Sequence, residues 1–134
     1  MEIESKQLAD KLEVIYLSGE LDSFGLRRFK QEIREAVAQG NKTIIVDCKE
    51  LGFISSSGLA ALLWARGTAN RHGARVYLTH VSATVNSVLE VTRLSRLLAI
   101  EPTTRDLLER LGRLRKTQPK LRRRRSLASK IRSW

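Results

Sequence analysis

Residues 43–48 constrain the fold of this chain more than any other segment. They are β-branched and almost entirely apolar, and polar residues bound them on both sides. A strand of this composition is typical of the middle of a sheet that is covered on both faces. A helix-like apolar run at 59–65 follows after a short polar segment. We therefore expect a central strand that leads directly into a helix.

Similar patterns recur along the chain. Strand-like runs at 3–8 and 12–18 are separated by a turn at Asp10 and Lys11. A helix with Asp22 or Ser23 as its cap is expected next, because apolar residues recur there at intervals of three and four. Its apolar stripe consists of Leu26, Phe29, Ile33, Ala36 and Val37. The later elements are expected as a helix from 56 or 57 to 71, a strand at 75–79, a helix at 83–91 capped by Ser82, an apolar run at 97–100 and a last helix from 103 or 104 carrying Leu107, Leu108, Leu111 and Leu114.

Strands that alternate with helices predict crossover connections. The expected fold class is α/β, with a largely parallel sheet and a hairpin of the first two strands at one edge. The length of 134 residues suits one domain with one core. No apolar run is long enough to span a bilayer, and the acidic N-terminus lacks the apolar stretch of a signal peptide. We expect a cytoplasmic protein.

The net charge of +11 is concentrated in one part of the chain. Residues 112–134 hold ten of the 25 basic residues and none of the 14 acidic ones, which leaves residues 1–111 with a net charge of +1. We therefore divide the chain into a folded domain at 1–111 and a basic C-terminal extension at 112–134.

Several kinds of enzyme are disfavoured by the motifs. The chain has neither a Gly-x-x-x-x-Gly-Lys-Ser/Thr phosphate loop nor a Gly-x-Gly-x-x-Gly motif, and Ile54 stands where a nucleophile elbow needs its first glycine. His72 and His80 could in principle serve as a base for a serine, but both fall at element boundaries, where surface histidines are common. Cys48 ends a strand and is expected to be a buried thiol. We expect no enzyme activity, no cofactor and no metal site.

Three consecutive serines, Ser55, Ser56 and Ser57, lie between the central strand and its helix. A serine hydroxyl can cap a helix by accepting a hydrogen bond from a free backbone N–H, but one cap requires one serine. We assign the cap to Ser56 and place Ser55 at the end of the strand. A hydroxyl beside the positive end of a helix dipole is also a favourable place for a phosphate.

Two motifs in this order resemble those of STAS domains in bacterial anti-sigma-factor antagonists. They are Gly-Glu-Leu-Asp at 19–22 and Phe-Ile-Ser-Ser-Ser-Gly-Leu at 53–59, and the resemblance covers approximately residues 3–111. It implies a four- to five-stranded, mixed but mostly parallel sheet with helices mainly on one side. It also implies a binding switch without catalysis of its own.

The resemblance implies a site as well as a fold. The serine before the motif glycine is the phosphorylation site of such antagonists, which here is Ser57, with Ser56 as the alternative. An anti-sigma factor that is also a serine kinase would add the phosphate, and a PP2C-type phosphatase would remove it. The unphosphorylated form would bind the anti-sigma factor and so free a sigma factor. Many members carry aspartate where this chain has Ser55. The expected partner-binding residues are Asp22, Ser23, Ser55, Ser56 and Gly58.

Two other functions stay open. The domain could be a structural adaptor in a larger complex, such as a lipid-transport assembly, in which case its serine would never be phosphorylated. It could also be a small serine enzyme, which the missing motifs disfavour.

The basic extension carries a run of four arginines, Arg122, Arg123, Arg124 and Arg125. If the segment after it were helical, Leu127, Ile131 and Trp134 would form a short apolar stripe. The extension is expected to be either disordered or an amphipathic helix. An anionic membrane surface, nucleic acid phosphates or an acidic protein are its candidate partners.

Overall fold

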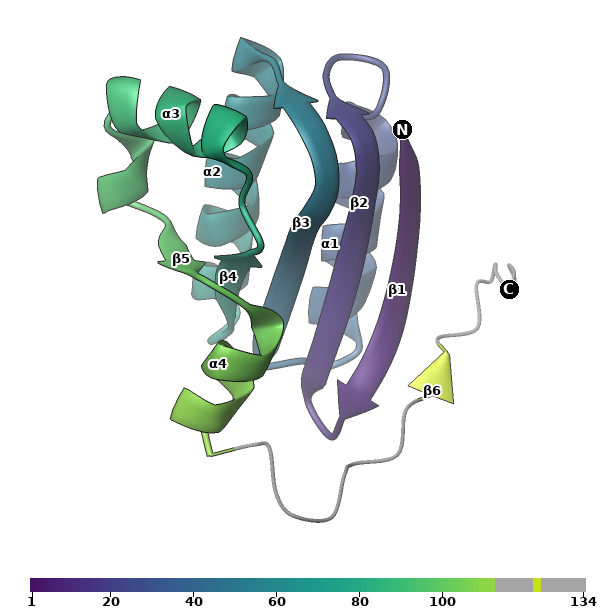
Figure 1. Ribbon diagram of the computed structural model, residues 1–134. Helices are drawn as coiled ribbons and strands as arrows, with labels where there is room; N and C mark the ends of the chain where they lie inside the picture. The colour runs from purple at the N-terminus through teal and green to yellow at the C-terminus, as the bar shows by residue number, and fades with distance from the viewer. Residues whose placement is uncertain (113–121, 124–134) are drawn as a thin grey trace.

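The structure is a computed structural model that describes residues 1–112 and the backbone of Arg122–Arg123 (Figure 1). The sheet has the strand order β5-β4-β3-β2-β1-β6. Its strands are β1 (Glu2–Ala9), β2 (Leu12–Leu21), β3 (Thr43–Ile54), β4 (Arg75–Thr79), β5 (Ala99–Glu101) and the two-residue β6 (Arg122–Arg123). The helices are α1 (Leu26–Ala38), α2 (Ser56–Arg71), α3 (Ala83–Val91), the 3-10 turn η1 (Leu94–Arg96) and α4 (Thr104–Arg110).

The pairing of the strands confirms the predicted α/β topology. Strands β1 and β2 form an antiparallel hairpin, and β2, β3, β4 and β5 run parallel to one another. Lys11 forms the hairpin turn with a left-handed φ of 60°. Strand β3 lies between β2 and β4 in the middle of the sheet, as its apolar composition predicted.

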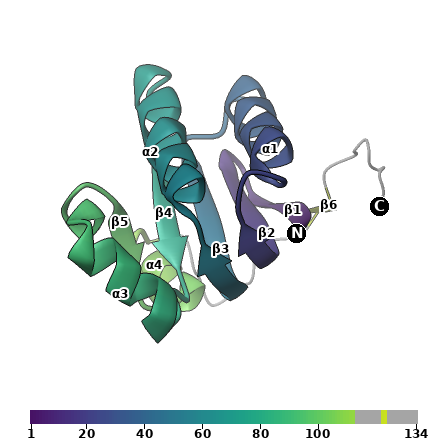
Figure 2. The same ribbon diagram turned by 90° about the horizontal axis from the view of Figure 1, so that it is seen from above.

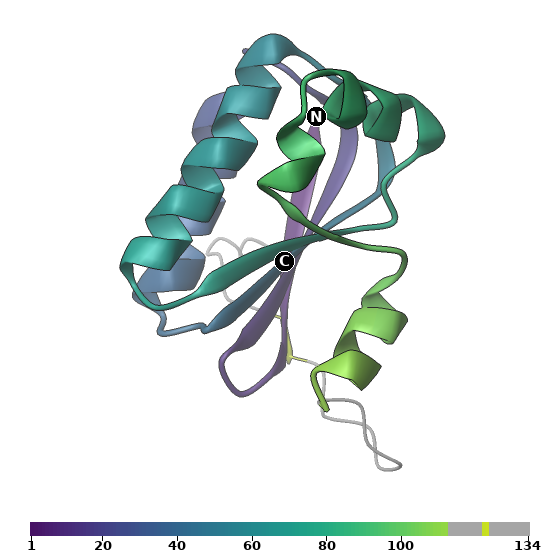
Figure 3. The same cartoon turned by 90° about the vertical axis from the view of Figure 1, so that its left-hand side faces the viewer.

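Each face of the sheet has its own core. Helices α1 and α2 pack side by side on one face, where Phe29, Ile33 and Leu62 are buried against the strands (Figure 2). Helix α4 covers part of the other face, where Leu107 packs with Leu12 and Ile45. Figure 3 shows α2 on one side of the sheet and α4 on the other, and Leu98, between η1 and β5, lies in the core that α2 covers. The helices therefore lie mainly, but not only, on one side.

Strands β2 and β3 extend further along the chain than predicted. Strand β2 continues through Gly19, Glu20 and Leu21, which we expected to be a connection, and β3 continues to Ile54. The two extensions pair with each other, and register shifts interrupt that pairing. Polar and glycine residues weakened the sequence pattern there, whereas hydrogen bonding between neighbouring strands maintains the sheet.

The predicted basic extension is described only at Arg122–Arg123. The backbone of these residues pairs antiparallel with Lys6 and Gln7 of β1, so it is a strand there and not a helical turn. Arg124, Arg125 and the proposed stripe of Leu127, Ile131 and Trp134 lie outside the described residues. The partners proposed for this segment stay predictions.

Candidate functional site

The loops after β2 and β3 leave the sheet beside each other. Leu21 and Ile54, the last residues of the two strands, are partners in the parallel register. The backbone N–H of Ser55 donates to the carbonyl of Leu21 at 3.0 Å, which joins the serine loop to the end of β2. The two motifs of the sequence, 19–22 and 53–59, are therefore neighbours in space.

Ser55, and not Ser56, caps helix α2. The Ser55 backbone is extended, and its Oγ accepts a hydrogen bond from the Gly58 N–H at 3.1 Å. The prediction that Ser56 is the cap is therefore wrong. The strand ends one residue earlier than that assignment required, because Ser55 N–H still bonds to Leu21 while its side chain already bonds to the helix.

The other two serines occupy the first turn of α2. The Ser57 side chain is half-buried, and its Oγ lies 3.0 Å from the Oγ of Ser55. Ser56 is exposed. The first backbone N–H groups of a helix have no acceptor within their own helix, so they are available to a negatively charged group at this end. In α2 the Gly58 N–H is already bonded to Oγ of Ser55.

Gly58 has a structural reason to be glycine. A Cβ atom at this position would lie 2.8 Å from Cγ1 of Ile54 and closer still to the carbonyl oxygen of Leu21. Gly58 is buried, so its observed contacts are with its own strands. The glycine lets the start of α2 pack directly on the ends of β2 and β3.

The predicted cap of α1 is wrong. The N-cap is Gly25, without a side-chain hydrogen bond, and α1 begins only at Leu26. Asp22 instead stabilises the turn before the helix, since its Oδ1 accepts the Phe24 N–H at 3.0 Å and its carbonyl accepts the Gly25 N–H at 3.1 Å. Ser23 is exposed in this turn. Both residues stay beside the serine loop.

Two aromatic side chains next to the serines were missed in the sequence. Phe24, in the turn after β2, is 95% exposed, and Phe53, near the end of β3, is 47% exposed. Single exposed apolar side chains are common, but two of them near the ends of neighbouring strands form a candidate contact surface. The sequence signal was present, since Phe24 lies between Ser23 and Gly25 and outside the apolar stripe of α1.

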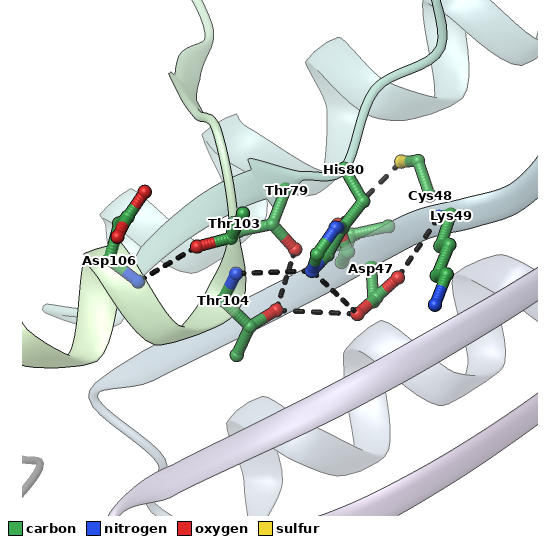
Figure 4. Close-up of polar contacts among 9 residues, drawn as sticks. Asp47, Cys48, Lys49, Thr79, His80, Thr103, Thr104 and Asp106 are labelled. Carbon is green, nitrogen blue, oxygen red and sulfur yellow. Dashed lines mark hydrogen bonds and ion pairs between the residues drawn. The ribbon is translucent and has the colours of Figure 1, made fainter.

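Neither histidine is placed to activate a serine. The Nδ1 atom of His72 lies 2.9 Å from the carbonyl of Thr68 at the far end of α2. Figure 4 shows His80 in a separate polar cluster, where its Nε2 accepts the Thr104 N–H at 3.3 Å and lies 3.8 Å from Oδ2 of Asp47. Between residues 1 and 112, no hydrogen bond or ion pair joins a histidine to Ser55, Ser56 or Ser57.

The polar cluster around Asp47 joins the first turn of α4 to the sheet. Oδ2 of Asp47 accepts from the Thr104 hydroxyl at 3.3 Å, and Thr104 lies in the first turn of α4. Cys48, the next residue, is 1% exposed, as predicted. Burial, and secondarily the negative charge of Asp47, raises the pKa of the Cys48 thiol to about 12. The Asp47–Thr104 hydrogen bond and the buried Cys48 thiol therefore stabilise the fold.

The described part of the chain has no candidate for a metal-binding cluster and none for a membrane-spanning helix. No group of three or more His, Cys, Asp or Glu residues there could hold a metal ion. Nor does any helix in it have the length and apolar character to cross a membrane. The fold and the serine loop together define a small α/β domain in which the start of α2 lies at the ends of β2 and β3.

Comparison with known proteins identifies the family. The family model described as "Mlab, STAS domain" matches residues 5–100. This chain belongs to the STAS domain family.

Several solved structures have a fold similar to that of this chain. The anti-sigma factor antagonist SpoIIAA in its unphosphorylated form is 26% identical, with a TM-score of 0.71, over 83% of this chain and 96% of that one. The phosphorylated form of the Bacillus cell fate determinant SpoIIAA is 25% identical, with a TM-score of 0.65, over 82% and 99%. An anti-sigma factor antagonist from Mycobacterium paratuberculosis shares the fold at 20% identity, with a TM-score of 0.71, over 83% and 95%.

Proposed function

We propose that this domain is an anti-sigma-factor antagonist controlled by phosphorylation of Ser57. Its unphosphorylated form binds an anti-sigma factor that is also a serine kinase, and so frees a sigma factor in the cytoplasm. A PP2C-type phosphatase restores that form. The observation that carries the proposal is the position of the Ser57 hydroxyl in the first turn of α2, next to the exposed Phe24 and Phe53 loops. The existence of a phosphorylated form of the similar protein SpoIIAA supports it.

The position of Ser57 suits a switch that changes binding and spares the fold. A phosphoserine carries about −1.5 to −2 charges at pH 7. Backbone N–H groups and the helix dipole stabilise a negative group at an exposed helix start by about 0.3–1 kcal/mol. A partner packed over the same loop would have to desolvate that charge, which costs a few kcal/mol and weakens binding by orders of magnitude.

The aromatic side chains give this partner surface an apolar centre. Phe24 lies in the turn after β2 and Phe53 near the end of β3, and Asp22 and Ser23 add polar groups to the edge of this surface. Protein interfaces are commonly anchored by a few aromatic residues surrounded by polar groups. A phosphate at Ser57 would be introduced at the margin of such an anchor.

The proposal is tested by copurification from the protein's own cells. Tagged wild type and Ser57→Ala should retain a protein kinase of the anti-sigma type, and Ser57→Asp should lose it while melting at nearly the same temperature. Ser87→Asp, at an exposed serine of α3 outside the predicted partner-binding residues, is the matched control and should retain the partner. Equal retention by Ser57→Asp and wild type would falsify the switch.

The second candidate function is a STAS adaptor subunit of a larger complex, for example one that transports lipids. It is favoured by the description of the matching family model, which names Mlab and not an antagonist. In that case Ser57 is never phosphorylated, and subunits of the complex copurify in fixed proportion. The same experiment therefore distinguishes the two functions.

A further inference from the structure

A hollow in the surface of the domain lies away from the serine loop. It has a volume of about 360 Å³ and is formed between the last turns of α2, the start of β4 and the segment from η1 into β5. Val76 of β4 and Leu98 pack in the core that α2 covers, so these elements meet on one face of the sheet. Arg66 lies nine positions after Ser57 on α2, which is about 14 Å along the helix axis. The hollow is therefore separate from the proposed switch.

Three arginines from three different segments line this hollow. They are Arg66 on α2, Arg75 on β4 and Arg96 on η1, and no Asp or Glu is among the lining residues. In the described structure, the ion pairs formed by arginines involve Arg105 and Arg110 and none of these three. The folded domain as a whole is almost neutral. The hollow is therefore a local concentration of positive charge that no carboxylate in its lining balances.

The hollow also has polar and apolar groups suited to a small ligand. Asn70, one turn after Arg66 on α2, adds an amide that can donate hydrogen bonds. Leu97 and Ala99 add apolar surface on the opposite side. The guanidinium carbon of Arg75 lies 5.5 Å from the ring centroid of Tyr77, which packs on the α4 face of the sheet, so the guanidinium groups available to a ligand beside α2 are those of Arg66 and Arg96.

We propose that this hollow binds the phosphate group of a small organic phosphate. Guanidinium groups match the geometry of phosphate oxygens and donate charge-assisted hydrogen bonds to them. Several such donors favour a doubly charged phosphate over a single carboxylate, and the apolar wall accommodates the carbon skeleton. A soluble metabolite and the headgroup of an anionic lipid present the same chemistry.

The test uses the full chain and two probes. Glycerol 3-phosphate is titrated while backbone amide NMR shifts are followed, with glycerol as the uncharged control. We expect saturable shifts at residues 66–70, 75–76 and 96–99, and binding weakened about tenfold or more in an Arg66→Gln/Arg96→Gln variant. The matched control, Arg27→Gln/Arg105→Gln, removes two exposed arginines elsewhere and should bind like wild type. Arg66 and Arg96 are exposed, so their variant should stay folded.

The second probe identifies the source of the phosphate. Vesicles of phosphatidylglycerol, with phosphatidylcholine vesicles as control, are sedimented with wild type and both variants. Saturable binding of glycerol 3-phosphate that depends on Arg66 and Arg96 assigns a soluble ligand. Vesicle binding alone, with the same dependence, assigns a lipid headgroup. The proposal is wrong if neither probe binds in a way that depends on Arg66 and Arg96. Vesicle binding that is equal in wild type and the Arg66→Gln/Arg96→Gln variant is such a result, because the basic extension would then account for it.

Discussion

The Oγ atoms of Ser55 and Ser57 lie 3.0 Å apart, and Ser55 is the residue that caps the helix on which Ser57 stands. The capping hydroxyl and the hydroxyl proposed for modification are thus different atoms in direct contact. Ser55 accepts the Gly58 N–H, so the start of α2 stays stabilised when Ser57 changes. This relationship allows the structural and the regulatory roles of the serines to be tested apart.

The cap predicts unequal effects of neighbouring serine substitutions. Ser55→Ala removes the hydrogen bond to the Gly58 N–H and should lower the free energy of unfolding by about 1 kcal/mol. Ser56→Ala removes an exposed hydroxyl and should change it by less than about 0.5 kcal/mol. Urea denaturation of both variants measures the difference. An equal loss in the two would mean that Ser55 is not the cap.

The packing at Gly58 predicts a large cost for one added methyl group. Gly58→Ala places a Cβ against Ile54 and the Leu21 carbonyl, and should cost about 1–3 kcal/mol or more, because backbone and core must shift. Gly67→Ala, in the same helix, has its nearest neighbour at 3.6 Å and should stabilise the domain by up to about 1 kcal/mol. Thermal melting of the two variants should therefore shift in opposite directions.

The exposed aromatic residues predict a loss of binding without a loss of stability. Phe24→Ala should weaken partner capture by about tenfold or more, because exposed aromatic anchors carry much of an interface's energy. The melting temperature should hardly change, since Phe24 is 95% exposed. Val91→Ala is the control, an 84% exposed apolar residue on α3. Partner capture that is unaffected by Phe24→Ala would place the interface elsewhere.

The buried thiol predicts a loss of stability at alkaline pH. The folded pKa of Cys48 is raised to about 12, above the unfolded value of about 8.5, so its contribution is complete below pH 8.5 and is lost as the pH rises. The free energy of unfolding should fall by up to about 1.4 kcal/mol per pH unit above that point.

Cys48→Ala provides the comparison. Its stability curve should lack this slope between about pH 8.5 and 10, although the variant starts from a lower stability because a core side chain is shortened. Burial also raises the pKa of Tyr16 above its ordinary value of about 10, so the contribution of Tyr16 to stability falls only at higher pH than that of Cys48. Identical slopes in wild type and variant would contradict the account of Cys48.

Much of the fold was predictable because hydrophobic periodicity is a local signal. The bounds of β4 and α3, and Ser82 as the cap of α3, agree with the structure. The ends of β2 and β3 were not predictable in this way, because pairing between the strands extends them through polar and glycine residues. The start of α1 was misplaced for a related reason: Asp22 has the sequence signature of a helix cap but stabilises a turn.

The site was predictable in position but not in the roles of its residues. The motifs singled out the serine loop and Asp22, and the register of Leu21 with Ile54 brings the ends of β2 and β3 together. The identity of the capping serine depends on the exact residue at which β3 ends. The sequence pattern does not locate the end of a strand to within one residue. The arginine hollow combines residues from three distant segments, and only the fold brings them together.

The most direct test of the central claim is phosphosite mass spectrometry of this protein purified from its own cells. The account predicts a phosphate on Ser57 in a fraction of the molecules, none on Ser55, and a partner kinase bound only to the unmodified fraction. Unmodified Ser57 under every growth condition, together with copurification of transporter subunits in fixed proportion, would contradict the switch and favour the adaptor.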